Sequence, residues 1–362
     1  MPLRPRPEIE KLAAAAHGGP DEAEFRNAGL SGGEITDFSV CSNPYMLPPD
    51  MSEIYRGAAI DRLPDSEATE FRERLGQILG VSPYNILAGN GAMEPLRLIA
   101  LGYFGQGDSV LIPEPTFGEY RVACQVSGAQ ITDRWAKEED NFNHNIEETA
   151  ELIRQTRPKG VFICNPNNPT GAYLSRQQIT DILDASPETL VVIDEAYISF
   201  VADSWSSLDL IERENLVIVR SMTKDFALAG LRLGYAVAHK NIIDILRRVR
   251  PPWSVNALAQ QAGIAVLKDY DRLETTRREI LAAKQFLVDE FTGLGFSIIP
   301  STTHFFLMKV TRPADFRTAL LKQGLLVRDC ASFGLPEYVR IAARTLPECR
   351  QLIKAVKEMK EW

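Results

Sequence analysis

Short apolar runs separated by helical segments fill the middle of this sequence. They occur at residues 86–88, 110–112, 161–164, 190–193 and 216–219. A strand without alternating polar positions is covered on both faces, and strands that alternate with helices are typical of a parallel sheet. The pattern therefore predicts an α/β protein with a large domain, in which a mostly parallel sheet is covered by helices.

The pattern changes after Pro251 and Pro252, because proline ends the helix before it. A long helical stretch follows, over about residues 256–294 with a break near 269–270. Short apolar runs then return at residues 296–299, 305–308, 325–327 and 339–342. We therefore predict an N-terminal arm at 1–40 that packs with the small domain, a large domain at 41–265, and a smaller α+β domain at 266–362.

The composition is that of an ordinary globular protein. Of the 362 residues, 45% are hydrophobic and 24% are charged. The net charge of −8 argues against general binding to nucleic acid or to an anionic membrane. The N-terminus lacks the apolar core of a signal peptide, and no stretch approaches the ~20 apolar residues of a membrane span. We therefore expect a cytoplasmic protein whose partner is a small molecule.

The cysteines and histidines show no spacing typical of a metal site. The five cysteines form no Cys-x-x-Cys pair, and the four histidines lack the spacing of metal ligands. We expect reduced cysteines that serve packing, and no bound metal.

Lys224 holds an unusual position, just past the apolar run at 216–219. Open α/β sheets place their sites at such strand ends, and a lysine amine there can form a Schiff base with an aldehyde. Ser221 and Thr223 add hydroxyl groups on the same turn, and Arg232 adds a guanidinium suited to a phosphate dianion. The stretch predicts a site for a phosphorylated aldehyde, although a surface Ser-x-Thr-Lys tetrapeptide is a common alternative.

Other strand ends carry loops that could serve the same site. The turn at 89–92 would aim backbone N–H groups at an anion, although a plain tight turn is the simpler explanation. The loop at 165–171 combines prolines with asparagines that can face a ligand oxygen. Asp194 follows a buried run, where it either pairs with a protonated ring nitrogen or caps the next helix. Phe117 either stacks on a planar ring or simply packs.

In this order the features resemble fold-type-I pyridoxal-phosphate enzymes of the aminotransferase superfamily, and the resemblance covers essentially the whole chain. It implies that Lys224 binds the cofactor aldehyde and moves the proton at the substrate Cα. Asp194 would pair with the pyridine nitrogen, and Asn168 and Tyr197 would hold the phenolic oxygen. By the same resemblance, ring stacking and phosphate binding are expected of Phe117, Gly91, Ala92, Met93, Ser221, Thr223 and Arg232.

The resemblance also implies a substrate site and a homodimer. Arg340 matches the position that grips a substrate carboxylate, and Arg328 matches a contact to a substrate phosphate. The expected substrate-binding residues are His17, Gly18, Asn43, Asn168, Arg328, Arg340 and Arg344. Leu63 departs from the family pattern, which often has a tyrosine there that reaches the cofactor phosphate of the neighbouring subunit.

Two subfamilies with phosphorylated substrates are similar to this chain, namely histidinol-phosphate aminotransferase and the threonine-phosphate decarboxylase of cobalamin biosynthesis. His17-Gly18-Gly19, Trp253-Ser254-Val255-Asn256 and the segment at 340–345 resemble the decarboxylase more. We therefore expect a lyase that converts L-threonine O-3-phosphate to (R)-1-amino-2-propanol phosphate, the linker of the cobalamin nucleotide loop. The aminotransferase of histidine biosynthesis is the alternative. A further alternative is a non-catalytic regulator that has the same fold and binds the cofactor.

Overall fold

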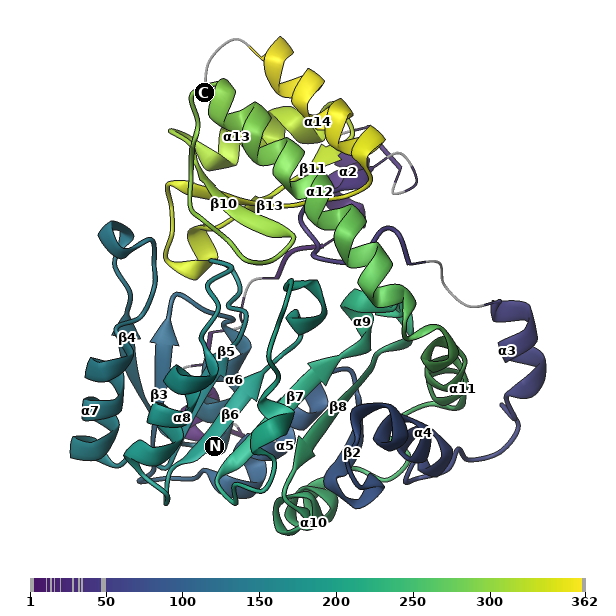
Figure 1. The fold of residues 1–362 in the computed structure, drawn as a ribbon, viewed down its shortest axis with the longest axis vertical. Helices are drawn as coiled ribbons and strands as arrows, with labels where there is room; N and C mark the ends of the chain where they lie inside the picture. Colours follow the sequence, from purple (N-terminus) through teal and green to yellow (C-terminus); the bar gives the residue numbers. More distant parts are fainter. Residues whose placement is uncertain are drawn as a thin grey trace.

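The computed structural model describes residues 3–10, 12–13, 15, 17–19, 21–27, 29–31, 33, 35–46 and 50–359. Figure 1 shows two parts, a lower part built on a large sheet and a smaller upper part that carries the C-terminal helices. Within the described residues, no helix is long and apolar enough to cross a membrane.

The large sheet has seven strands among the described residues and is mostly parallel, as predicted. Only β8 runs antiparallel to both of its neighbours, β2 and β7. The other neighbouring strands pair in parallel, so their carboxyl ends meet at one edge of the sheet. The strand order is β2 (Ile86–Asn90), β8 (Leu233–Ala238), β7 (Leu216–Ser221), β6 (Leu190–Asp194), β5 (Gly160–Cys164), β3 (Ser109–Glu114) and β4 (Gln130–Trp135).

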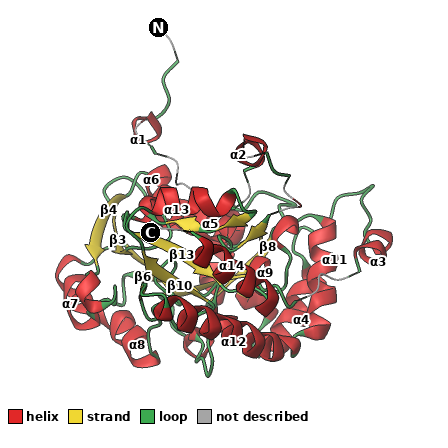
Figure 2. Ribbon diagram, turned by 90° about the horizontal axis from the view of Figure 1, so that it is seen from above, coloured by secondary structure: helices red, strands yellow, loops and turns green. Residues whose placement is uncertain are grey.

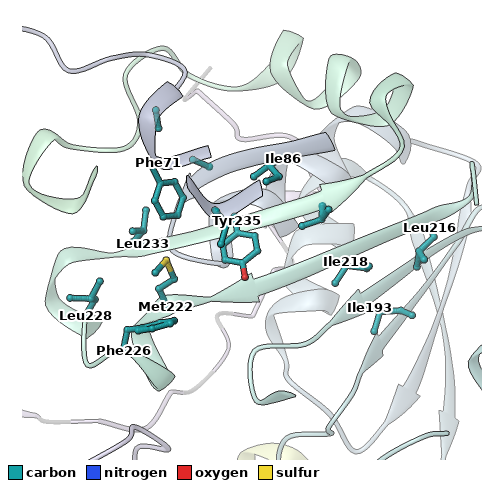
Figure 3. Packing of buried hydrophobic residues seen from close by; sticks show 14 of the residues in the cluster. Phe71, Ile86, Ile193, Leu216, Ile218, Met222, Phe226, Leu228, Leu233 and Tyr235 are labelled. Carbon is teal, nitrogen blue, oxygen red and sulfur yellow. The ribbon is translucent and has the colours of Figure 1, made fainter. Parts of the chain in front are cut away.

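Helices cover both faces of this sheet, which explains why the strands are continuous apolar runs. In β7, Leu216 and Ile218 join one hydrophobic cluster, while Val217 and Val219 join another on the opposite face. Figure 3 shows Leu216, Ile218 and Tyr235 within the first cluster. That face packs against α4 (Thr69–Leu79), α7 (Ile146–Thr156), α8 (Arg176–Ala185) and α11 (Ala257–Val266). The other packs against α5 (Met93–Tyr103), α6 (Glu119–Ser127) and α10 (Lys240–Val249).

The smaller part is built on an antiparallel sheet. Its strand order is β12 (Arg328–Asp329), β13 (Tyr338–Ala342), β10 (Phe305–Lys309) and β9 (Ser297–Ile298). The long helical stretch is broken as expected, because a short 3₁₀ turn at Leu267–Asp269 separates α11 from α12 (Arg272–Gly293). A separate core of buried side chains, which includes Phe291 and Phe316, holds this sheet against α12, α13 (Pro313–Leu321) and α14 (Leu346–Glu358).

The N-terminal residues contact both parts. β1 (Thr36–Asp37) pairs with β11 (Leu325–Leu326), and Phe25 of α2 (Glu22–Asn27) packs near the same strand. Earlier in the chain, α1 (Pro7–Glu10) lies beside α6 instead, away from the smaller part (Figure 2). The described N-terminal residues thus contact the large part at α1 and strand β11 at β1.

Candidate active site

A cavity of about 1150 Å³ opens where the carboxyl ends of the parallel strands face the smaller part. The large part contributes Asp194 and Lys224, the smaller part contributes Arg328 and Arg340, and the N-terminal segment contributes His17. Most of the predicted site residues line this cavity, namely His17, Gly18, Ala92, Met93, Phe117, Asn168, Asp194, Tyr197, Ser221, Thr223, Lys224, Arg232, Arg328 and Arg340.

Lys224 lies on α9 (Met222–Asp225), a single helical turn that Ser221 caps at the end of β7. Burial is the largest influence on the Lys224 amine and lowers its pKa, and the nearby guanidiniums of Arg340 and Arg232 lower it further. Lys224 Nζ forms no hydrogen bond or ion pair with any of the described residues. The amine is therefore placed and tuned to react as a nucleophile.

Asp194 is a buried carboxylate at the end of β6 with two donors of its own. The Tyr120 hydroxyl donates to Asp194 Oδ2 at 2.7 Å, and the backbone N–H of Ala196 donates to Oδ1 at 3.0 Å. Burial raises the pKa of Asp194 to about 6. A cation, such as a protonated ring nitrogen, would offset the free-energy cost of burying the negative charge of Asp194.

Tyr120 is a site residue that the sequence did not reveal. Its ring is fully buried and stacks on Phe162, with ring centroids 5.2 Å apart and an interplanar angle of 15°. In the sequence it occupies an ordinary apolar position on α6, and no motif marks it. Its hydroxyl fixes the orientation of the Asp194 carboxylate.

An anion cradle lies beside Lys224, at the N-terminus of α5. No described side chain caps that helix, so its first N–H groups have no side-chain partner, and Ala92 and Met93 at its start line the cavity. The Ser221 and Thr223 hydroxyl oxygens are 2.7 Å apart and line the same cavity. Gly91, just outside the cavity wall, has φ of +67°, and a Cβ there would lie 2.7 Å from Arg232 Nη2. The glycine therefore lets the Arg232 guanidinium reach the cradle, which fits a phosphate dianion.

Arg340 is buried and contacts Asn168. Arg340 Nη1 donates to Asn168 Oδ1, and Nη2 donates to the Ser39 carbonyl at 2.6 Å. Arg340 Nε is buried without a hydrogen-bond partner among the described residues. A buried guanidinium with an unused donor is suited to an anionic ligand.

Arg328 provides a second guanidinium near Arg340. Its Nη2 donates to Ser332 Oγ at 2.7 Å, and its Cζ lies 5.5 Å from the centroid of the Phe333 ring. Arg340 approaches the same ring at 6.0 Å. Burial and the neighbouring Arg340 lower the pKa of Arg328, so an anion between the two guanidiniums would relieve their repulsion.

Phe117 and Tyr197 complete the predicted walls of the cavity. Phe117 follows β3 and meets the edge of Tyr120, with ring centroids 5.6 Å apart at 81°. Tyr197 follows β6 and packs against Phe305, with centroids 5.0 Å apart. Both side chains line the cavity from the large sheet.

Asn43 and Arg344 were expected to bind substrate, but both lie outside the cavity wall. The Asn43 N–H donates to the Lys224 carbonyl at 2.7 Å, and its side chain donates to Thr276 Oγ1 at 2.9 Å. Arg344 Nη2 donates to Glu348 Oε1 at 2.8 Å, at the start of α14. In the structure these two side chains hold elements together.

No site for a metal is found in the part of the chain that the structure describes, where no three His, Cys, Asp or Glu side chains are grouped suitably. The cysteines are buried and free.

Comparisons with known proteins identify relatives along most of the chain. The family model for aminotransferase class I and II matches residues 34–356. A histidinol-phosphate aminotransferase of Thermoanaerobacter sp. (strain X514) is 36% identical over 87% of this chain and 90% of its own length. The structure is similar to histidinol-phosphate aminotransferase from Clostridium acetobutylicum, with a TM-score of 0.81, 26% identity, and 89% and 98% of the two chains covered. L-threonine-O-3-phosphate decarboxylase from Porphyromonas gingivalis has a TM-score of 0.77, 28% identity and the same coverage.

The expected decarboxylation of threonine phosphate, and with it the lyase of cobalamin biosynthesis, is wrong. Curated relatives at 30–36% identity over most of the chain are histidinol-phosphate aminotransferases. Of the features that favoured the decarboxylase, Trp253 and Arg344 lie outside the cavity wall, whereas His17 and Gly18 line it. Arg328 and Arg340 suit the phosphorylated substrates of either subfamily.

Proposed function

Because the chain belongs to the aminotransferase class I and II family, we propose that it is a pyridoxal-phosphate-dependent aminotransferase that takes the amino group from histidinol phosphate. The identity of 36% to a histidinol-phosphate aminotransferase, over 87% of this chain, is the observation that carries the proposal. The two guanidiniums of the cavity support a substrate with a phosphate group.

Pyridoxal 5'-phosphate is the cofactor, and the residues of the cavity fit it. The cradle of Arg232, the Ser221 and Thr223 hydroxyls and the α5 N-terminus would hold its phosphate. Asp194, whose burial disfavours its own charge, would pair with the protonated ring nitrogen. When bound, the cofactor withdraws electrons from the α-carbon of an attached amino compound.

Lys224 and the residues around it have different roles in the proposed reaction. Lys224 would anchor the cofactor aldehyde and move the proton at the substrate α-carbon, and the burial that lowers its pKa favours the neutral amine that both roles need. Asp194 keeps its negative charge at the ring nitrogen, and Tyr120 holds that carboxylate in place. Asn168 and Tyr197 are assigned to the phenolic oxygen of the cofactor.

Arg328 and Arg340 are assigned to the substrate anion. Histidinol phosphate carries a phosphate monoester and no carboxylate, so both guanidiniums would bind one dianion. Holding the phosphate there would orient the amine of the substrate toward Lys224, and such orientation contributes to the rate.

The substrate assignment is tested with two amino donors, histidinol phosphate and histidinol, and 2-oxoglutarate as acceptor. We expect kcat/KM to be at least about 100-fold higher for histidinol phosphate, because two charge-assisted contacts are lost with the phosphate. The Arg328→Met variant should lose most of that preference. Arg312→Met is the matched control, because Arg312 is exposed and lies outside the cavity. Equal kcat/KM for the two donors in the wild-type enzyme would contradict the proposal.

A further inference from the structure

The N-terminal segment places an imidazole ring in the wall of the cavity. His17 Nε2 lies 2.8 Å from Glu119 Oε1, and the His17 ring centroid lies 5.9 Å from that of Phe117. The adjacent Gly18 packs on the side chain of Arg328, whose guanidinium is assigned to the substrate phosphate. A Cβ at Gly18 would lie 3.2 Å from Arg328 Cδ. One short segment thus covers both a carboxylate and a guanidinium of the cavity.

Glu119 is the fixed partner in this contact, and His17 is the replaceable one. The Glu119 side chain is 9% exposed, whereas that of His17 is 51% exposed. Glu119 is the first residue of α6, where the helix dipole favours a carboxylate, and Arg97 Nη2 holds its Oε2 at 2.7 Å. His17 belongs to no helix or strand. If His17 left, Glu119 Oε1 would need another donor, because a buried carboxylate oxygen without one is costly.

We propose that Glu119 recognises the imidazole of the substrate, and that His17 fills this place while no substrate is bound. The inference rests on the proposed function, whose substrate carries an imidazole and a phosphate. The substrate imidazole would donate its N–H to Glu119 Oε1 beside Phe117. The phosphate would reach Arg328, from which Gly18 must withdraw. Entry of substrate therefore displaces His17 and Gly18 together.

The two partners of the contact between His17 and Glu119 should therefore have opposite effects on the affinity for the substrate. Loss of Glu119 removes a contact with the substrate, whereas loss of His17 removes a competitor. While His17 occupies the site, the substrate cannot bind there. The apparent dissociation constant of the substrate is therefore its intrinsic value divided by the fraction of time that the site is free. If His17 instead bound the substrate directly, as the family resemblance implies, losing it would weaken binding.

The test compares Glu119→Gln and His17→Ala with the wild-type holoenzyme, and uses His239→Ala as the control because His239 caps α10 outside the cavity. KM for histidinol phosphate and the calorimetric Kd of 4-methylimidazole are measured for each. We expect both constants to rise about tenfold in Glu119→Gln, as for loss of a charge-assisted hydrogen bond, and to fall at least about threefold in His17→Ala. The His239→Ala control should leave both constants and kcat unchanged within about twofold.

The two measurements separate this inference from the proposed function. Turnover of histidinol phosphate with an unchanged Kd for 4-methylimidazole in both variants would overturn the inference alone. The expected shifts in that Kd without turnover of histidinol phosphate would overturn the proposed function alone. A weaker binding in His17→Ala would also overturn the inference. If Glu119→Gln failed to fold, the direction of change in His17→Ala would decide.

Discussion

Burial controls the charge of three ionisable side chains around α9 and β6. It lowers the pKa of Lys224, raises that of Asp194 to about 6 and raises that of Asp225 to about 7. In each case burial is the largest cause and it disfavours the charged form. For Lys224 and Asp194 the cofactor would supply the compensating group. Asp225 does not line the cavity, and its Oδ1 is buried without a hydrogen-bond partner among the described residues.

Lys224 should be the residue that holds the cofactor covalently. After borohydride treatment, peptide mass spectrometry should find the mass of the reduced cofactor on the peptide with Lys224. The Lys224→Ala variant should lose this label and at least about a thousandfold in kcat. Lys284 is the matched control, because burial also lowers its pKa but it lies outside the cavity. A label that persists in Lys224→Ala and disappears in Lys284→Ala would disprove the assignment.

Asp225 should make the folded protein less stable as the pH rises. Its folded pKa of about 7 lies above the ordinary aspartate pKa of 3.8, so between these values the folded state holds a proton that the unfolded state releases. Stability present below about pH 4 is therefore lost as the pH rises toward 7. Asparagine cannot ionise. The free energy of unfolding of Asp225→Asn, relative to that of the wild type, should therefore rise by roughly 3 kcal/mol between pH 5 and pH 7.5. Urea unfolding at both pH values measures this, and a constant difference between the two proteins would refute it.

The sequence predicted which residues meet at the site wherever a strand end fixed their position. Lys224, Asp194 and Ser221 follow buried parallel strands, and such strand ends share one edge of the sheet. Arg344 was expected to bind substrate, and the structure places its side chain outside the cavity wall. Matching a motif gives a position along the chain and no direction for the side chain. The pair Thr345 and Glu348 forms a capping box at α14, and this local signal could have assigned Arg344 to that helix end.

At the scale of elements, the approach of β8 to the start of α5 builds the phosphate cradle. The Gly91 N–H donates to the Arg232 carbonyl at 2.8 Å, and Arg232 itself has φ of +60°. The sequence indicated a glycine-rich turn at this point, but a plain turn explained it equally. It could not reveal that an arginine 141 positions later would occupy the space of the missing side chain, because β2 and β8 are adjacent only in the folded sheet.

Gly91→Ala should weaken cofactor binding by displacing Arg232. A Cβ at Gly91 would lie 2.7 Å from Arg232 Nη2, so the guanidinium must move from the cradle. We expect the Kd of pyridoxal phosphate, measured by absorbance titration, to rise about tenfold with the loss of a charged hydrogen bond. Gly107→Ala is the control, because Gly107 has φ of +90° and nothing within 4 Å of its Cβ position. An equal change in both variants would mean that backbone strain alone is responsible.

At the scale of the whole molecule, the cavity is assembled from segments far apart in the sequence. The large part supplies the proposed cofactor residues, and the small sheet supplies Arg328 and Arg340. The N-terminal segment closes the wall with His17 and Gly18. The mostly parallel sheet and its helical cover were predictable from periodicity. The periodicity did not predict how the small sheet and the N-terminal segment are placed against the strand ends, because that placement depends on long-range packing.

The protein should form a homodimer through an exposed apolar surface at the start of the large part. Met51, Tyr55, Ile60 and Leu63 are between 39% and 66% exposed, on and just after α3 (Met51–Gly57). Sedimentation should give twice the 40.3 kDa of the chain, and Leu63→Asp should weaken the association. Leu101→Asp, with Leu101 60% exposed on α5, should remain a dimer. A wild-type protein that sediments as a monomer would contradict this expectation.

The most direct test of the account is glutamate formation from histidinol phosphate and 2-oxoglutarate by the purified holoenzyme. We predict stoichiometric glutamate, with no CO₂ released from threonine phosphate in a parallel reaction. No glutamate from histidinol phosphate, together with CO₂ from threonine phosphate, would contradict the proposed function.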